Sequence, residues 1–201
     1  MTTLTLSVEN DSNALLYVMD ETALRTESDI RRSWSPVGES PILESNNSHE
    51  GVNIVGATKI TKKFETVCDV YPAEQPITGL EIEEFIKYLL NHNPGKKIYL
   101  VLDNARPHNN HKIQELWNKN RDRLELINTP AYSPQLNPQE NIWNLLKNKI
   151  FNIGARKNID ELYDEIEKLY KQFNNNKALI MSVAYARNYY FNSQYMEEIS
   201  T

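Results

Sequence analysis

Two apolar runs, each ending in an acid, constrain the fold of this 201-residue chain most. The first is Ala14-Leu-Leu-Tyr-Val-Met-Asp20, and the second is Lys97-Ile-Tyr-Leu-Val-Leu-Asp103. The second run has the continuous apolar character of a strand that is covered on both faces, as in parallel sheets. We therefore predict two covered strands, each with a carboxylate at the point where its covered part ends.

The intervening segments predict further strands and a helix. Residues 52–60 and 64–71 are rich in Val, Ile, Thr and aromatic side chains, and Lys62-Lys63 between them indicates a hairpin. We expect these two strands and the first to be antiparallel. Apolar residues at helical spacing over 80–90, followed by Asn93-Pro94-Gly95, predict a helix that leads into the second acid-terminated strand.

The second half of the chain continues the alternation of helices and strands. We expect a short helix at 112–118, a strand at 124–127 and a loop from Thr129 to Asn137. One helix then begins at Pro138, and another is marked by apolar residues at steps of three and four over 159–173. Strand, helix and strand in succession imply a parallel crossover, so the fold class is α/β with a mixed sheet flanked by helices.

Composition limits the class of protein. A chain of this length with 40% hydrophobic residues supports one full core, and its single cysteine, Cys68, has no internal disulfide partner. No apolar run approaches the roughly 18 residues of a membrane span, and residues 1–12 lack a signal peptide's apolar core, so we expect a cytoplasmic protein. The net charge of −5 argues against coating nucleic acid through bulk positive charge, so any DNA contact must be local.

The three acids at the element ends each have a simple structural explanation. Asp20 shares strand parity with Leu16 and Val18, while Glu21 points to the other face. Asp20 and Asp103 fit strand-terminating turns as well as functional sites. Glu140 fits a capping box, because Asn137 is a good N-cap, Pro138 suits the first helical position and Glu140 occupies the third.

The combination of the three positions points to metal chemistry. Hard cations such as magnesium take carboxylate oxygens and keep several waters, so three acids on rigid elements suffice for two ions. Two ions roughly 3.5 to 4 Å apart clamp the attacking and leaving oxygens of a phosphodiester. We therefore predict that Asp20, Asp103 and Glu140 converge in space as metal ligands.

Four motifs resemble a known family. They are Leu16-Tyr-Val-Met-Asp-Glu-Thr22, Trp34-Ser-Pro-Val-Gly38, Val101-Leu-Asp-Asn-Ala-Arg-Pro-His108 and Pro130-Ala-Tyr-Ser-Pro-Gln-Leu-Asn-Pro-Gln-Glu-Asn-Ile-Trp143. Together they resemble the DDE transposases of the mariner superfamily, especially its bacterial insertion-sequence 630 branch. The resemblance runs from about residue 15 to 173, and the 37 positions from Asp103 to Glu140 are similar to the family's spacing.

The resemblance implies a ribonuclease H-like fold and a site at Asp20, Asp103 and Glu140 that holds two Mg²⁺ or Mn²⁺ ions. It implies DNA endonuclease and strand-transfer activity on double-stranded DNA at transposon ends, with a TA target, a homodimer in the active complex and a nucleoid-associated location. Asn104 and His108 match family positions near the site, where a histidine contacts the scissile phosphate or supports a carboxylate, or else plays a capping or packing role. Tyr132 and Ser133 resemble the loop that shapes the site wall.

Basic residues near these motifs are candidates for phosphate contact, although most charged pairs on a surface are merely solvated. The candidates are Arg106, Lys147, Lys149, Arg31, Arg32, Arg156 and Lys157. Family members carry helix-turn-helix domains ahead of the first catalytic strand, where this chain has about fourteen residues. We therefore expect a lead-in at 1–14, a catalytic domain at 15–175 and a helical tail at 176–201, without terminal-repeat recognition.

Two other functions remain open at this point. A non-catalytic, truncated transposase would regulate by pairing with a full-length enzyme, although the three intact acids favour catalysis. A general ribonuclease H-like nuclease would share the metal site and act on RNA–DNA hybrids, but the Asn137-Pro138 block gives it no support.

Overall fold

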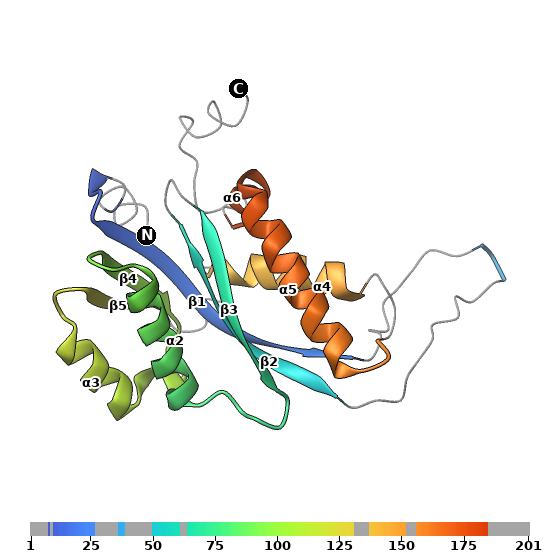
Figure 1. Ribbon diagram of the computed structural model, residues 1–201, viewed down its shortest axis with the longest axis horizontal. Coiled ribbons are helices and arrows are strands. Elements are labelled where there is room, and N and C mark those ends of the chain that lie inside the picture. Colours follow the sequence, from blue (N-terminus) through green and yellow to red (C-terminus); the bar gives the residue numbers. More distant parts are fainter. Residues whose placement is uncertain are drawn as a thin grey trace.

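A five-stranded mixed sheet forms the centre of the protein, with the strands in the order β3-β2-β1-β4-β5. The computed structural model describes residues 8, 10–26, 36–38, 50–60, 64–130, 137–151 and 156–184. Helices lie on both faces of this sheet (Figure 1). The elements in chain order are β1 (Ala14–Arg25), β2 (Gly51–Lys59), β3 (Glu65–Pro72), α2 (Gly79–His92), β4 (Lys97–Leu102), the 3₁₀ helix η1 (Arg106–Asn109), α3 (His111–Lys119), β5 (Leu124–Asn128), α4 (Gln139–Phe151), α5 (Ile159–Asn175) and α6 (Lys177–Ala184).

Strand β1 is the centre of the sheet. It pairs antiparallel with β2, which pairs antiparallel with β3, so the expected hairpin and the expected antiparallel opening are confirmed. On its other side β1 pairs parallel with β4, and β4 pairs parallel with β5. The two acid-terminated runs are therefore neighbours in the sheet.

β1 continues five residues beyond Asp20, past the end of the apolar run that predicted the strand. Residues 21–25 have mixed polarity, but each of them pairs with a residue of β2 between Gly51 and Val55. The backbone ladder to β2 thus extends the strand where the side-chain pattern alone does not. Asp20 consequently lies inside β1 rather than at its end. At and beyond Asp20, β1 pairs with β2 but no longer with β4.

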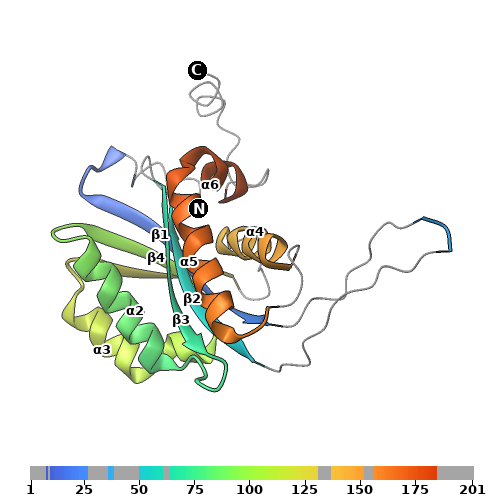
Figure 2. The same cartoon turned by 45° about the vertical axis from the view of Figure 1, so that its right-hand side comes forward.

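Two hydrophobic cores lie on the two faces of the sheet. Alternation along β1 sends Leu16 and Val18 to one core and Tyr17 and Met19 to the other. The first core is covered by α4, α5 and α6, and the second by α2 and α3. Figure 2 shows these two groups of helices on opposite sides of the strands. The predicted parity of Asp20 therefore places it on the α4 face.

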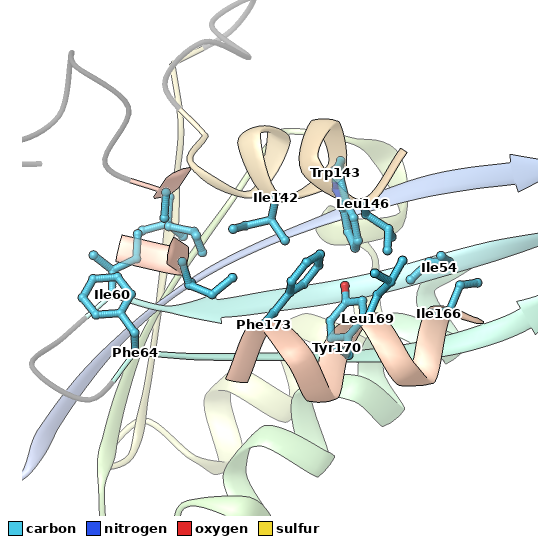
Figure 3. Close-up of a cluster of buried hydrophobic side chains, with 14 of the residues drawn as sticks. Ile54, Ile60, Phe64, Ile142, Trp143, Leu146, Ile166, Leu169, Tyr170 and Phe173 are labelled. Atoms are coloured by element: carbon cyan, nitrogen blue, oxygen red, sulfur yellow. The ribbon is translucent and has the colours of Figure 1, made fainter. Parts of the chain in front are cut away.

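The core beneath α4 and α5 is the larger of the two. In Figure 3, α4 contributes Ile142, Trp143 and Leu146, and α5 contributes Ile166, Leu169, Tyr170 and Phe173 to the same cluster. Burying a large apolar side chain stabilises the fold by roughly 1.5 to 3 kcal/mol. This packing therefore holds the first turn of α4 against the sheet.

Side-chain caps define several helix ends. Thr78 and Glu81 form a capping box at the start of α2, while Asn110 and Asn158 cap α3 and α5. The side chain of Asn174 donates to the carbonyl of Thr66 at 2.9 Å and accepts from the Thr66 N–H at 2.9 Å. It therefore satisfies both backbone groups of one residue on the edge strand β3. None of the helices within the described part of the chain has the length and apolarity needed to span a membrane.

Candidate metal and active site

Asp20 and Asp103 stand at the same level on neighbouring parallel strands. Val18 of β1 is in register with Val101 of β4, and each acid lies two residues further along its strand direction. Neighbouring strands are about 4.8 Å apart. Both acids have the parity of valines that face the α4 core, so the topology brings their backbones together at one end of the sheet.

The start of α4 is tied to β1 beside Asp20. The Nδ2 of Asn137 donates to the carbonyl of Met19 at 3.2 Å, and its Oδ1 accepts the N–H of Gln139 at 3.1 Å. Asn137 is therefore the N-terminal cap that the sequence indicated. Glu140 is half-buried in the first turn. Its side chain takes part in none of the hydrogen bonds found among the described residues, so the cap rests on Asn137 rather than on a reciprocal box.

Asp20 interacts electrostatically with the other acids. Burial raises the pKa of Asp20 to about 7, and the charge of Glu140 is the next largest cause. The charges of Glu21 and Asp103 add to the increase. Three neighbouring carboxylates thus destabilise the charged form of Asp20, which is the electrostatic condition that a bound cation relieves.

A glycine lets α4 approach the sheet at this point. Gly56 of β2 is the partner of Asp20 in the β1–β2 ladder. A Cβ at position 56 would lie 2.4 Å from Cη2 of Trp143 and 3.2 Å from Nε2 of Gln139. The absence of a side chain therefore sets the separation between α4 and the strands, and with it the position of Glu140 relative to Asp20. Sequence reasoning missed Gly56, although a glycine inside an apolar strand indicates a close approach.

Gln139 anchors the same turn of α4 to the sheet. Its side chain is buried, and its Oε1 accepts the hydroxyl of Thr58 at 2.7 Å. The hydroxyl oxygen of Thr58 is also 3.0 Å from that of Thr66, so a polar contact runs from α4 across β2 to β3. The residue next to Glu140 is thus held to β2 by a side-chain hydrogen bond, and Thr58 extends this polar contact to β3.

His108 joins Glu21 and Asp103. Its ring is fully buried, with Nε2 2.6 Å from Oε1 of Glu21 and Nδ1 2.7 Å from Oδ1 of Asp103. Burial alone would lower the pKa of His108, but the hydrogen bond and charge of Glu21, together with the charge of Asp103, raise it to about 9. Nδ1 also lies 3.2 Å from the backbone carbonyl oxygen of Asp103, so His108 contacts two acidic residues, and the roles expected for it stay predictions. Sequence reasoning did not single out Glu21.

Asp103 also closes a turn of its own. Its Oδ1 accepts the N–H of Ala105 at 2.8 Å, which is the Asx turn that the sequence allowed. The next residue, Asn104, donates from Nδ2 to the carbonyl of Thr129 at 2.7 Å and so ties the segment after β4 to the end of β5. Half of the Asp103 side chain remains exposed, so a turn role and a ligand role are compatible.

The donor chemistry of these acids fits a hard divalent cation. Within the described ranges, no three His, Cys, Asp or Glu side chains form a ready-made metal cage. Magnesium does not need one, because it is commonly held by one or two carboxylates together with waters and substrate phosphates. Burial and the charges of Glu140, Glu21 and Asp103 raise the pKa of Asp20, so these acids interact electrostatically.

The family follows from the sequence profile. The profile described as DDE superfamily endonuclease matches residues 15–163, which include all three acids. This chain belongs to the DDE superfamily of endonucleases. No curated protein sequence matches it.

Solved structures show the same fold for this DDE superfamily chain. The Mos1 transposase paired-end complex with the left transposon end has a TM-score of 0.63 at 11% identity, over 95% of this chain and 61% of that one. The mariner Mos1 paired-end complex with Mg has a TM-score of 0.63 at 11% identity, over 85% and 52%. The Mos1 mariner catalytic domain has a TM-score of 0.55 at 9% identity, over 95% and 91%.

The expected ribonuclease H-like sheet is therefore confirmed by its likeness to the Mos1 catalytic domain. The chain spans 61% of the length of the Mos1 transposase in the first of these structures. At such identities the likeness concerns the fold alone.

The remaining expected residues of this DDE superfamily chain have different surroundings. Arg106 is exposed on η1 and Lys147 is half-buried on α4. Arg156 is 4% exposed and pairs with Glu165, and its side chain also donates to the carbonyl of Ile150, so the phosphate contact predicted for it is wrong. Four further candidates lie outside the described residues: Tyr132, Ser133, Arg31 and Arg32.

Proposed function

We propose that this chain is the catalytic domain of a transposase of the mariner superfamily, in its bacterial insertion-sequence 630 branch. It cuts DNA at transposon ends, and the freed 3′-hydroxyl attacks a phosphodiester of target DNA. The observation that carries this proposal is the environment of Asp20. Burial first and the charge of Glu140 next raise the pKa of its carboxyl, with smaller effects of Glu21 and Asp103. The parallel pairing of β1 with β4 brings Asp20 and Asp103 to the same end of the sheet. The four sequence motifs and the family membership support the same function.

Asp20, Asp103 and Glu140 are the residues that would hold two Mg²⁺ or Mn²⁺ ions. When bound, such ions stabilise the attacking and leaving oxygens of a phosphodiester. The chain's own contribution is to fix the carboxylates. Asp20 lies in a strand paired with β2, Asp103 is held by an Asx turn and His108, and Glu140 starts a helix capped by Asn137.

Double-stranded DNA is the proposed partner. Mos1 has been solved in paired-end and strand-transfer complexes, and we extend this to transposon ends, a TA target and a homodimer for the present chain. Because the net charge is −5, contacts to phosphate must be local. Arg106 on η1, with Lys147 and Lys149 on α4, are the proposed contacts.

The proposed catalytic domain comprises residues 15–175, between a proposed lead-in at 1–14 and a proposed tail at 176–201. Most of the lead-in, and the tail after residue 184, lie outside the described residues. We place the protein in the bacterial cytoplasm, on the nucleoid. This location follows from the proposed DNA substrate.

Asp103→Asn tests the proposed function. Asparagine keeps the shape and an oxygen that accepts the Ala105 N–H, but it removes the charge that a hard cation requires. We expect the full chain to cut an end-mimicking duplex in Mn²⁺ and the variant to lose this activity without a large change in thermal unfolding. Asp69→Asn, a half-buried acid on β3, is the matched control and should cut like the parent.

The substrate comparison separates the alternatives. Cutting of an RNA–DNA hybrid in preference to duplex DNA would indicate a ribonuclease H-like nuclease. An inactive parent that suppresses a full-length transposase would indicate a regulatory protein. Retained cutting by Asp103→Asn would show that Asp103 is only a turn residue.

A further inference from the structure

Glu21 follows Asp20 directly but belongs to the opposite face of β1. Strand alternation turns it away from α4 and towards the face that α2 and α3 cover. There its Oε1 lies 2.6 Å from Nε2 of His108, 87 positions later in the chain. The acid therefore has a specific partner that neither the strand pattern nor the metal site accounts for.

We propose that Glu21 is a positioning residue that acts through His108 to hold the carboxylate of Asp103 in the orientation required for metal binding. This inference rests on the proposed function of Asp103. The chain of contacts is continuous: Oε1 of Glu21 lies 2.6 Å from Nε2 of His108, and Nδ1 of His108 lies 2.7 Å from Oδ1 of Asp103 and 3.2 Å from the backbone carbonyl oxygen of Asp103. It links β1 to the residue that follows β4 through a side chain from η1.

The exposure of the three side chains explains why such a link matters. The Asp103 side chain is 49% exposed, so packing alone does not confine it to one rotamer. The His108 side chain is 0% exposed and contacts Asp103 from the protein interior. With Oδ1 engaged by both His108 and the Ala105 N–H, the second carboxylate oxygen is the one left to face a cation.

Glu21 fixes the ring that performs this task. An imidazole has two nearly equivalent orientations about its terminal torsion unless both nitrogens have partners. Removing Glu21 would leave a buried N–H without its acceptor, and a buried donor without a partner favours rearrangement. Partners that orient a metal-ligating side chain typically change metal affinity by about 10- to 100-fold when they are mutated.

Calorimetric titration of the full chain with Mn²⁺, in the absence of DNA, tests the inference without relying on catalysis. Glu21→Gln should weaken Mn²⁺ binding by about 10-fold. Glu21→Asp keeps the charge but is one methylene shorter, so it should lose affinity as well. Glu65→Gln is the matched control, because Glu65 is 28% exposed and also pairs with a histidine, His92, at 3.0 Å. It should bind Mn²⁺ like the parent.

A double-mutant cycle separates positioning from simple charge. If Glu21 acts through His108, adding Glu21→Gln to His108→Gln should cause no further loss of Mn²⁺ affinity. A charge that acts on the cation directly would give losses that multiply. Thermal unfolding without metal, measured on each variant, shows whether affinity falls while the fold is retained.

Three outcomes would overturn the inference. They are parental Mn²⁺ affinity in Glu21→Asp, multiplying losses in the cycle, or unfolding of both Glu21 variants at the assay temperature, which would make Glu21 a fold-stabilising residue. A parent chain that binds no Mn²⁺ would instead refute the proposed function on which the inference rests.

Discussion

Gly56→Ala should disturb both the stability of the fold and the proposed active site. The added Cβ would lie 2.4 Å from Cη2 of Trp143 and 3.0 Å from Cζ2. An ordinary carbon contact is about 3.5 to 4.0 Å, so the indole and α4 must move by roughly 1 Å. Trp143 is 1% exposed and packed in the core, so it has no solvent-filled space into which to move.

The expected loss of stability follows from overpacking. Extra methyl groups in a well-packed core destabilise proteins by about 1 to 3 kcal/mol. In a chain of this size each kcal/mol lowers the melting temperature by about 2 to 4 °C. Because α4 carries Glu140 and Gly56 is opposite Asp20, a displaced helix should also reduce DNA cutting by more than the stability loss explains.

Thermal unfolding and cutting of an end-mimicking duplex in Mn²⁺ measure the two effects. Trp143→Phe provides the partner variant, since it removes the ring atoms that the new Cβ would meet. The two substitutions together should destabilise less than the sum of the single changes, by about 0.5 kcal/mol or more. Strict additivity, or a Gly56→Ala variant with parental stability, would refute the idea that this glycine sets the approach of α4.

Two further substitutions distinguish structure from chemistry among the acids. Glu140→Gln should change the free energy of unfolding by less than about 1 kcal/mol, because Asn137 provides the cap and only the helix-dipole contribution of Glu140 is lost. DNA cutting should nevertheless be lost. A variant that cuts at the parental rate would show that Glu140 is a structural residue. Asp20→Asn should stabilise the metal-free chain at pH 8. The folded pKa of Asp20 is about 7 against an ordinary value of 3.8, so the folded state binds more protons between these values and stability falls as pH rises through them. We expect a gain of up to about 4 kcal/mol in urea unfolding with EDTA at pH 8, shrinking towards pH 4. An equal effect at both pH values would contradict this origin.

The sequence predicted the parts of the fold that depend on local pattern. Apolar runs and helical spacing located the strands and helices to within a few residues, and strand parity placed Asp20 on the α4 face. The extension of β1 to Arg25 was missed because it depends on pairing with β2 rather than on side-chain polarity. The strand order β3-β2-β1-β4-β5 likewise depends on long-range pairing.

The supporting residues of the site were harder to predict, and for physical reasons. Glu21 and His108 are 87 positions apart, and no local rule relates them. Arg156 was named as a candidate phosphate contact because its burial arises from its contacts with α4 and α5, which the sequence pattern does not show. Gly56 carried a usable signal, since a strand glycine often marks a close approach.

A crystal structure of the full chain grown with Mn²⁺, with the ions located by anomalous scattering, tests the central claim most directly. We predict two Mn²⁺ ions about 3.5 to 4 Å apart, bound by carboxylate oxygens of Asp20, Asp103 and Glu140. Ions bound elsewhere, or a Glu140 carboxylate that contacts neither ion while Asp20 and Asp103 do, would contradict it.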